Sequence, residues 1–219
     1  MNRLAVFDCD GTLVDSQVTI CEAIARGFVA CALPQPTRAA ARSIIGLSLV
    51  EAMRVLHPEG EPAQHDALAA AYKVAFFEMR TAGLSDEPLY EGIAQAIADL
   101  DARGWLLGVA TGKSDRGLKH ILEYHRLHPH FITLQTADGH PSKPHPSMLE
   151  QAMADAGARP DTTVMIGDTS YDMAMAKNAG VHAIGVTWGY HGEEELRAAG
   201  AGQIVTHASE LVALIETLA

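Results

Sequence analysis

The chain has 219 residues, of which 48% are apolar and 20% charged, and its formal net charge is −11. This length is enough for one sizeable core, alone or with a smaller inserted domain, and the acidic balance argues against nucleic-acid binding, which normally needs a basic face. No apolar run approaches the roughly 18 residues of a membrane span, and the first residues do not resemble a signal peptide, so we expect a cytoplasmic protein that does not bind membranes.

The predicted elements fall into two parts. Residues 4–7 form an apolar run that predicts a buried parallel strand. Residues 15–84 are rich in Ala, Leu, Met and Glu and predict three or four helices, at about 16–31, 37–44, 48–57 and 63–81. After Pro88 the pattern alternates, with strands near 105–110, 131–135, 163–166, 182–188 and 203–205, and helices near 91–103, 114–127, 146–156, 170–179, 193–199 and 209–218.

Alternation of apolar strands with helices predicts an α/β protein with a doubly wound parallel sheet. We expect residues 1–14 and 85–219 to form this core and residues 15–84 to form an inserted helical domain. In such sheets, ligands bind at the carboxyl ends of the strands. Polar residues follow the apolar runs at three of these ends, at Asp8, Thr111 and Asp168.

Two aspartates, Asp8 and Asp10, follow the first predicted strand. Residues two apart in an extended chain point to the same side, so both carboxylates are expected in one small volume. They repel unless a cation lies near them or one holds a proton, and Mg²⁺ prefers oxygen ligands and suits phosphate chemistry. One carboxylate could then be a nucleophile and the other a general acid, while Gly11 allows the backbone to turn toward a phosphate.

Three later segments supply further polar groups. Thr111 and Gly112 can donate to an anion from the side chain and the backbone. Lys143 lies between prolines, where its point charge could be held against a phosphate. Asp168 stands at a strand end, and Asp172 lies one helical turn beyond it.

Together these motifs carry a resemblance to a known family. The run from Asp8 to Ser16, then Thr111, Lys143 and the run from Gly167 to Asp172, resembles the haloacid dehalogenase superfamily. Within it, the chain is similar to the phosphoglycolate phosphatase-like branch, which has a Rossmann-like core and a helical cap inserted after the first strand. The resemblance spans nearly the whole chain.

The resemblance implies catalytic roles for three residues. Asp8 would be the nucleophile and would form an aspartyl-phosphate. Asp10 would protonate the leaving alcohol and then activate water, and its backbone carbonyl would also contact the metal. Lys143 would neutralise charge between Asp8 and the transferred group.

The same resemblance implies a set of binding residues. Gly11, Thr111, Gly112 and Lys143 would bind the phosphoryl group. Mg²⁺ would be held by Asp8, Asp10 and Asp168, with Asp172 acting behind these ligands or alternating with them.

Several alternatives remain beside a phosphatase. Dehalogenases of the superfamily lack the second aspartate of the first motif, which this chain has at Asp10, and phosphonoacetaldehyde hydrolases use a cap lysine that residues 44–48 lack. A phosphomutase of the β-phosphoglucomutase type and a non-catalytic phosphate-binding protein stay open. We therefore expect a Mg²⁺-dependent phosphatase, monomeric or homodimeric, that acts on a small phosphorylated metabolite such as phosphoglycolate or a sugar phosphate.

Substrate choice is expected to lie in the inserted helices. The turn at Gly46, Leu47 and Ser48 separates two predicted helices and is expected to face the catalytic end of the sheet. Arg38, Arg42 and Arg54 are either anion contacts or ordinary exposed residues of these helices.

Overall fold

The computed structural model describes residues 2–218 and contains a six-stranded sheet in the order β3-β2-β1-β4-β5-β6. All neighbouring strands are parallel. The strands are β1 (Asn2–Phe7), β2 (Leu106–Thr111), β3 (Phe131–Thr136), β4 (Ala158–Gly167), β5 (His182–Val186) and β6 (Gln203–Val205). From β1 the strands run outward to β2 and β3 on one side, and from β4 they run outward to β5 and β6 on the other. This order is that of a doubly wound sheet, so the predicted fold is confirmed.

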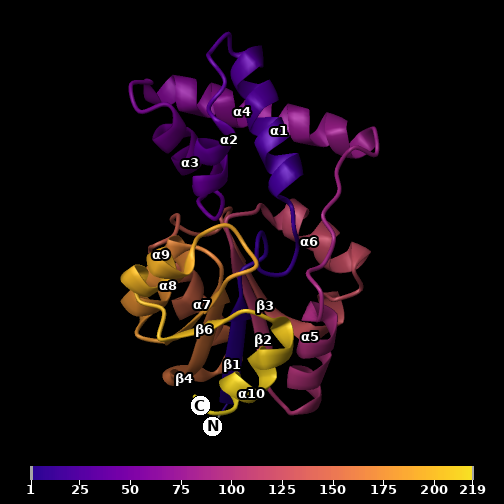
Figure 1. Cartoon of the computed structure of the whole chain (residues 1–219), viewed down its shortest axis with the longest axis vertical. Helices are drawn as coiled ribbons and strands as arrows, with labels where there is room; N and C mark the ends of the chain where they lie inside the picture. Colours follow the sequence, from indigo (N-terminus) through magenta and orange to yellow (C-terminus); the bar gives the residue numbers. More distant parts are fainter. Residues whose placement is uncertain (1, 219) are drawn as a thin grey trace.

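Helices cover both faces of this sheet (Figure 1). The core helices are α5 (Ile93–Ala102), α6 (Asp115–Tyr124), α7 (Ser147–Ala156), α8 (Ser170–Ala179), α9 (Glu193–Ala199) and α10 (Leu211–Ile215), with short 3₁₀ helices η1 (His128–His130) and η2 (Ala208–Glu210). One buried cluster joins the sheet to α5, α6 and α10 through residues such as Phe7, Trp105 and Ile97. The other joins it to α7, α8 and α9 through Met165 and Leu149.

Four further helices lie between β1 and α5 in the chain, and we call them the helical insertion. They are α1 (Gln17–Ala30), α2 (Arg38–Ser43), α3 (Leu49–Leu56) and α4 (Pro62–Thr81). The helical insertion has its own apolar core, which includes Ile24, Phe28, Met53 and Leu68. It stands over one end of the sheet, and the two termini lie at the other end (Figure 1).

The chain enters and leaves the helical insertion along adjacent paths. Val14 on the outgoing segment forms a bridge with Leu89 on the returning segment. The amide of Asp15 donates to the carbonyl of Pro88 at 2.9 Å. The insertion is thus joined to the core by a paired connection.

The helix ends follow the capping chemistry of the sequence. Ser114 accepts a hydrogen bond from the amide of Gly117, as a helix N-cap does. Glu61 and Gln64 form a capping box around Pro62 at the start of α4. Gly157 and Gly180 end α7 and α8 in the left-handed conformation.

Some element boundaries differ from the sequence prediction. β4 begins at Ala158, five residues before the predicted strand, because Asn2 pairs with Ala158 across a register shift in β1. β5 ends at Val186, so Trp188 lies beyond the strand. The last predicted helix is shorter and begins as the 3₁₀ turn η2. No helix within residues 2–218 combines the length and apolarity needed to cross a membrane.

Candidate active site

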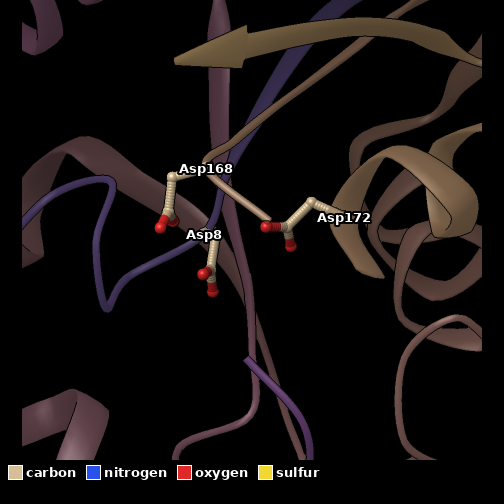
Figure 2. Close-up of side chains that lie close together, drawn as sticks. All are labelled: Asp8, Asp168 and Asp172. Carbon is tan, nitrogen blue, oxygen red and sulfur yellow. The ribbon is translucent and has the colours of Figure 1, made fainter. Parts of the chain in front are cut away.

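Three buried carboxylates meet where β1 and β4 end. Asp8 directly follows β1, Asp168 directly follows β4, and Asp172 lies in the first turn of α8. One oxygen from each lies within 4.8 Å of the others, and Figure 2 shows the three side chains around a common space. Phe7 is paired with Ile166 in the sheet, so the register of β1 and β4 brings Asp8 and Asp168 together.

The Asp168 carboxylate is held by groups from two loops. Its Oδ1 accepts a hydrogen bond from the Thr12 hydroxyl, and its Oδ2 accepts one from the Tyr190 amide, both at 2.9 Å. The backbone of Gly11 lies so close that a Cβ there would meet Asp168 Oδ2 at 2.1 Å. A Cβ on Gly189 would meet the Asp168 side chain at 2.2 Å. Only glycine fits at these two positions, and Asp168 has little freedom to move.

Both oxygens of Asp172 have partners. Oδ2 accepts hydrogen bonds from the amide and hydroxyl of Thr169, at 3.0 and 2.7 Å. Oδ1 accepts one from the Lys143 ammonium at 2.6 Å. The Asp172 amide donates to the Thr169 hydroxyl at 3.3 Å, which completes the capping box of α8. Asp172 therefore fixes the start of α8 and positions Lys143.

The Lys143 side chain lies fully inside the protein between two carboxylates. Its Nζ is 2.8 Å from Asp8 Oδ1 and 2.6 Å from Asp172 Oδ1. Burial alone would lower the pKa of this ammonium, but the charges of Asp172 and Asp8 outweigh burial and raise the pKa. Lys143 is thus a fixed positive charge next to Asp8.

The Asp8 carboxylate has unusual surroundings. Burial raises its pKa from 3.8 to about 7, the charge of Lys143 opposes that rise, and the charge of Asp172 adds to it. Among the described residues, neither Asp8 oxygen accepts a conventional hydrogen bond, and the ion pair with Lys143 is its main contact. A buried carboxylate with so few donors has free lone pairs for a cation or for attack on an electrophile.

The charge balance of the group fits a divalent cation. Asp8, Asp168 and Asp172 face one ammonium, that of Lys143. Unbalanced negative charge in a buried volume is unfavourable unless a cation or protons compensate it. Carboxylate oxygens are the ligands that Mg²⁺ and Ca²⁺ prefer, so the residues present fit such an ion.

The Asp10 side chain is not one of the three clustered carboxylates and has partners of its own. Asp10 Oδ1 accepts a short hydrogen bond from the Ser16 hydroxyl and lies 2.8 Å from Lys113 Nζ. Lys113 in turn lies 3.0 Å from Glu87 Oε1, on the segment that returns from the helical insertion. A buried chain of charges therefore joins Asp10 to the connection between the two parts of the molecule.

Thr111 and Gly112 lie at the end of β2, on the same edge of the sheet as Asp8. The Thr111 hydroxyl accepts a hydrogen bond from the Lys113 amide at 3.2 Å. A Cβ on Gly112 would lie 2.5 Å from the carbonyl oxygen of Leu47. The turn between α2 and α3 therefore rests directly on this loop.

That turn contacts two other loops of the candidate site. The Ser48 amide donates to the Ser142 hydroxyl at 2.9 Å, next to Lys143. An added Cβ on Gly46 would lie 3.2 Å from Thr169 Oγ1. The turn at residues 46–48 faces the catalytic end of the sheet, as expected.

Two of the arginines considered as anion contacts have other partners. Arg42 donates to the carbonyl oxygens of Tyr190 and Gly189. Arg54 pairs with Glu51 on the surface of α3. Arg42 joins the helical insertion to the core, and Arg54 forms an ordinary exposed pair.

Sequence reasoning did not identify several residues that hold the site. Thr12 and Tyr190 bind Asp168, and Glu87 and Ser16 complete the chain around Asp10. Ser16 and Thr12 lie within the first motif, where a hydroxyl near two aspartates is a usable signal. Glu87 and Tyr190 lie in irregular segments, and no local pattern distinguishes them from other loop residues.

A family model agrees with this geometry. The model described as haloacid dehalogenase-like hydrolase matches residues 5–186, a span that includes all three clustered carboxylates and Lys143. This match confirms the family resemblance seen in the motifs.

Named relatives point in the same direction. The chain is 38% identical to the probable phosphatase IndB of Dickeya dadantii, over 100% of this chain and 95% of that protein. It is 28% identical to a phosphoglycolate phosphatase of Vibrio vulnificus, over 87% and 86%. It is also 30% identical to the tyrosine-protein kinase PtkA of Mycobacterium tuberculosis, over 99% of this chain and 72% of that protein.

A solved structure shares the complete fold. A protein described as a predicted phosphatase from Clostridium acetobutylicum superposes with a TM-score of 0.89 at 27% identity, and the match covers 100% of both chains. The helical insertion and the sheet are both included in that match.

Proposed function

The chain belongs to the haloacid dehalogenase-like hydrolase family, and from that premise we propose that it is a Mg²⁺-dependent phosphatase. The substrate is a small phosphate monoester, and the reaction passes through an aspartyl-phosphate on Asp8. The observation that carries this proposal is the Asp8 carboxylate, which is buried at a strand end, is paired with Lys143 and finds no other donor within residues 2–218.

The first step transfers the phosphoryl group from the substrate to Asp8. An Asp8 oxygen attacks phosphorus, and the bond from phosphorus to the ester oxygen breaks. Asp10 gives a proton to the departing alcohol oxygen, while Ser16 and Lys113 hold its carboxyl group in place. Thr111, Gly112 and the turn at Gly11 donate hydrogen bonds to the transferred group, in which negative charge is spread over several oxygens.

The second step releases phosphate. Asp10, now deprotonated, takes a proton from a water molecule that attacks phosphorus and restores the Asp8 carboxylate. Lys143 lies 2.8 Å from Asp8 Oδ1 and stabilises the negative charge of both steps. The sum is phosphate ester and water converted to alcohol and phosphate.

The metal site of this proposal uses Asp8, Asp168 and the backbone carbonyl of Asp10. Bound Mg²⁺ would supply positive charge that screens the phosphate from the surrounding carboxylates. Asp172 acts behind the ligands, because its oxygens are taken by Thr169 and Lys143.

The two parts of the chain have separate roles in the proposal. Residues 1–14 and 85–219 supply the chemistry, and residues 15–84 act as a cap that covers the substrate and excludes water. The enzyme works in the cytoplasm as a monomer or homodimer, on a metabolite rather than on nucleic acid or a membrane.

Phosphate release tests this function. Purified protein should release inorganic phosphate from p-nitrophenyl phosphate with Mg²⁺, and EDTA should abolish the release. A phosphate-binding protein would release none, and a phosphomutase would move the phosphoryl group within a sugar phosphate instead. Transfer to a tyrosine hydroxyl with little release to water would favour an activity like that named for PtkA.

A further inference from the structure

A cavity of about 300 Å³ lies between the helical insertion and the core, beside Asp10. Its core side is formed by Asp10, Gly112, Lys113 and the start of α6. Its other side comes from α1, α3, α4 and the turn before α3. The cavity therefore begins at the residue that protonates the leaving oxygen in the proposed reaction.

The side formed by the helical insertion is predominantly apolar. The hydrophobic residues that line it are Ile20, Ile24, Ile44, Ile45, Leu47, Leu49, Val50, Ala52, Met53, Phe76 and Phe77. The polar residues of this side are Ser48, Tyr72, Lys73 and Arg80, and a polyol held against the apolar remainder would lose hydrogen bonds to water. An apolar group would gain from leaving water.

Four cations line the cavity, of which Lys113 and Arg80 have carboxylate partners, while Lys73 and Arg116 are exposed. Lys113 lies within 3.0 Å of both Asp10 and Glu87. Arg80 lies 3.9 Å from Glu87, and its guanidinium is 5.1 Å from the ring centroid of Phe76. Lys113 and Arg80 are held in this network and are not free to bind a sugar or a second anion, and the Arg116 guanidinium lies 5.8 Å from the ring centroid of Phe77.

The volume indicates the size of the group that the cavity can cover. A cavity of roughly 150 Å³ lined by aliphatic and aromatic side chains holds benzene. A space of about 300 Å³ has room for one ring with a short chain that reaches toward Asp10.

We propose that the cavity is the alcohol subsite, and that the preferred substrate is a phosphate monoester whose alcohol carries an apolar body, such as an aryl-alkyl group. This inference rests on the proposed function and narrows it. It disfavours phosphoglycolate and simple polyol phosphates as the best substrates.

Two phosphate esters of primary alcohols test the proposal, because their leaving alcohols are similar in reactivity and differ mainly in polarity. The ratio of kcat/KM for 2-phenylethyl phosphate to kcat/KM for glycerol 3-phosphate should be about 100 or more. A ratio near or below one would overturn the proposal. The comparison uses the full chain with Mg²⁺.

Matched variants on α3 identify the cavity as the cause. Leu49→Ala removes an apolar contact from the lining and should lower the ratio about tenfold. Val55→Ala changes a residue of the same helix that is 51% exposed and outside the lining, and should leave the ratio unchanged. A ratio insensitive to Leu49→Ala would contradict the assignment of the subsite.

Failure of the inference and failure of the proposed function give different results. If glycerol 3-phosphate and phosphoglycolate are hydrolysed through Asp8 as well as the aryl-alkyl ester, the phosphatase stands and the subsite inference fails. If no ester releases phosphate, the proposed function fails and the inference fails with it.

Discussion

Gly11 must be glycine for two independent reasons. Its φ of +90° lies in the left-handed region, which side chains disfavour. An added Cβ would also lie 2.1 Å from Asp168 Oδ2, a carboxylate that two hydrogen bonds hold in place. The turn after Asp8 thus brings the backbone against the second carboxylate of the site.

Gly11→Ala should abolish more than 99% of the activity, because Asp168 must move to admit the methyl group. A misplaced catalytic group typically costs about 100-fold or more in rate. Gly104→Ala is the matched control, since Gly104 has a φ of +78° and open space around it. The control should lose about 1 kcal/mol of folding stability and keep its activity. Phosphate release and urea unfolding measure the two effects, and equal activity in both variants would contradict the explanation.

Lys113 positions Asp10 without contacting the proposed nucleophile. Lys113→Met should lower kcat/KM about 100-fold for an alkyl phosphate, whose leaving oxygen needs a proton from Asp10 in the transfer to Asp8. The same variant should lower kcat/KM for p-nitrophenyl phosphate much less, because kcat/KM reports the transfer step and this leaving group departs without protonation. Lys119→Met, on the exposed face of α6, is the control and should change neither rate. An equal loss for both substrates would indicate a structural role only.

The sequence identified most of the residues in the carboxylate group but not their contacts. Asp8, Lys143, Asp168 and Asp172 are brought together as their positions at strand ends and in loops predict. Asp10 is not one of the three clustered carboxylates, although its charge also raises the pKa of Asp8. The reason is local, because β1 ends at Phe7 and the chain then turns, so that Asp10 meets Ser16 and Lys113.

At the scale of elements, the turn between α2 and α3 joins the helical insertion to the catalytic loops in three places. It meets Gly112, Ser142 and Thr169, which lie in three different loops. Through these contacts the turn covers part of the candidate active site. A turn that rests on the backbone of its partner tolerates no added volume at the contact.

Gly112→Ala should lower kcat/KM at least tenfold, because a Cβ there would lie 2.5 Å from the Leu47 carbonyl oxygen and would push the turn away. Gly139→Ala is the control, as no atom lies within 4 Å of its added Cβ. Steady-state kinetics with p-nitrophenyl phosphate compare the two. Wild-type kcat/KM in Gly112→Ala would show that the contact is not needed.

Secondary structure was predictable where apolar periodicity and caps agree. α8 and α9 have the predicted bounds, and Gly180 ends α8 as predicted. The prediction made β4 too short because residues 159–162 are polar or exposed, and this part of the strand joins the sheet only through the pairing of Ala158 with Asn2 of β1. That pairing is tertiary and leaves no pattern in the local sequence.

For the whole molecule, metal binding and folding stability are linked through Asp8. A carboxyl group whose pKa rises on folding stabilises the fold below its unfolded pKa, and that contribution is lost as pH rises through the folded value. For Asp8 this window extends from 3.8 to about 7. Burial also raises the pKa of Asp168, so both groups act in the same direction.

Mg²⁺ should therefore stabilise the protein more at high pH than at low pH. The increase in Tm on adding Mg²⁺ should be small at about pH 5, where protons compete for the carboxylates, and several degrees at about pH 8. Differential scanning fluorimetry with Mg²⁺ or EDTA measures this difference. Asp8→Asn should reduce the increase at high pH, and an increase that does not depend on pH would contradict the linkage.

Because the formal net charge is −11, positive charge at the site must compensate the negative charge of the protein if a phosphate ester is to bind. An acidic enzyme attracts a phosphate ester only where fixed cations and a metal ion reverse the local charge. Lys143 supplies the fixed charge beside Asp8, and the carboxylate group fits the metal.

The most direct test of the mechanism is to locate the phosphoryl group during turnover. The protein is mixed with substrate and Mg²⁺, quenched rapidly in acid, digested and analysed by mass spectrometry. We predict a phosphorylated peptide that contains Asp8, present during turnover and absent in Asp8→Asn, which releases no phosphate. Phosphorylation of another residue, or continued turnover in Asp8→Asn, would contradict the account.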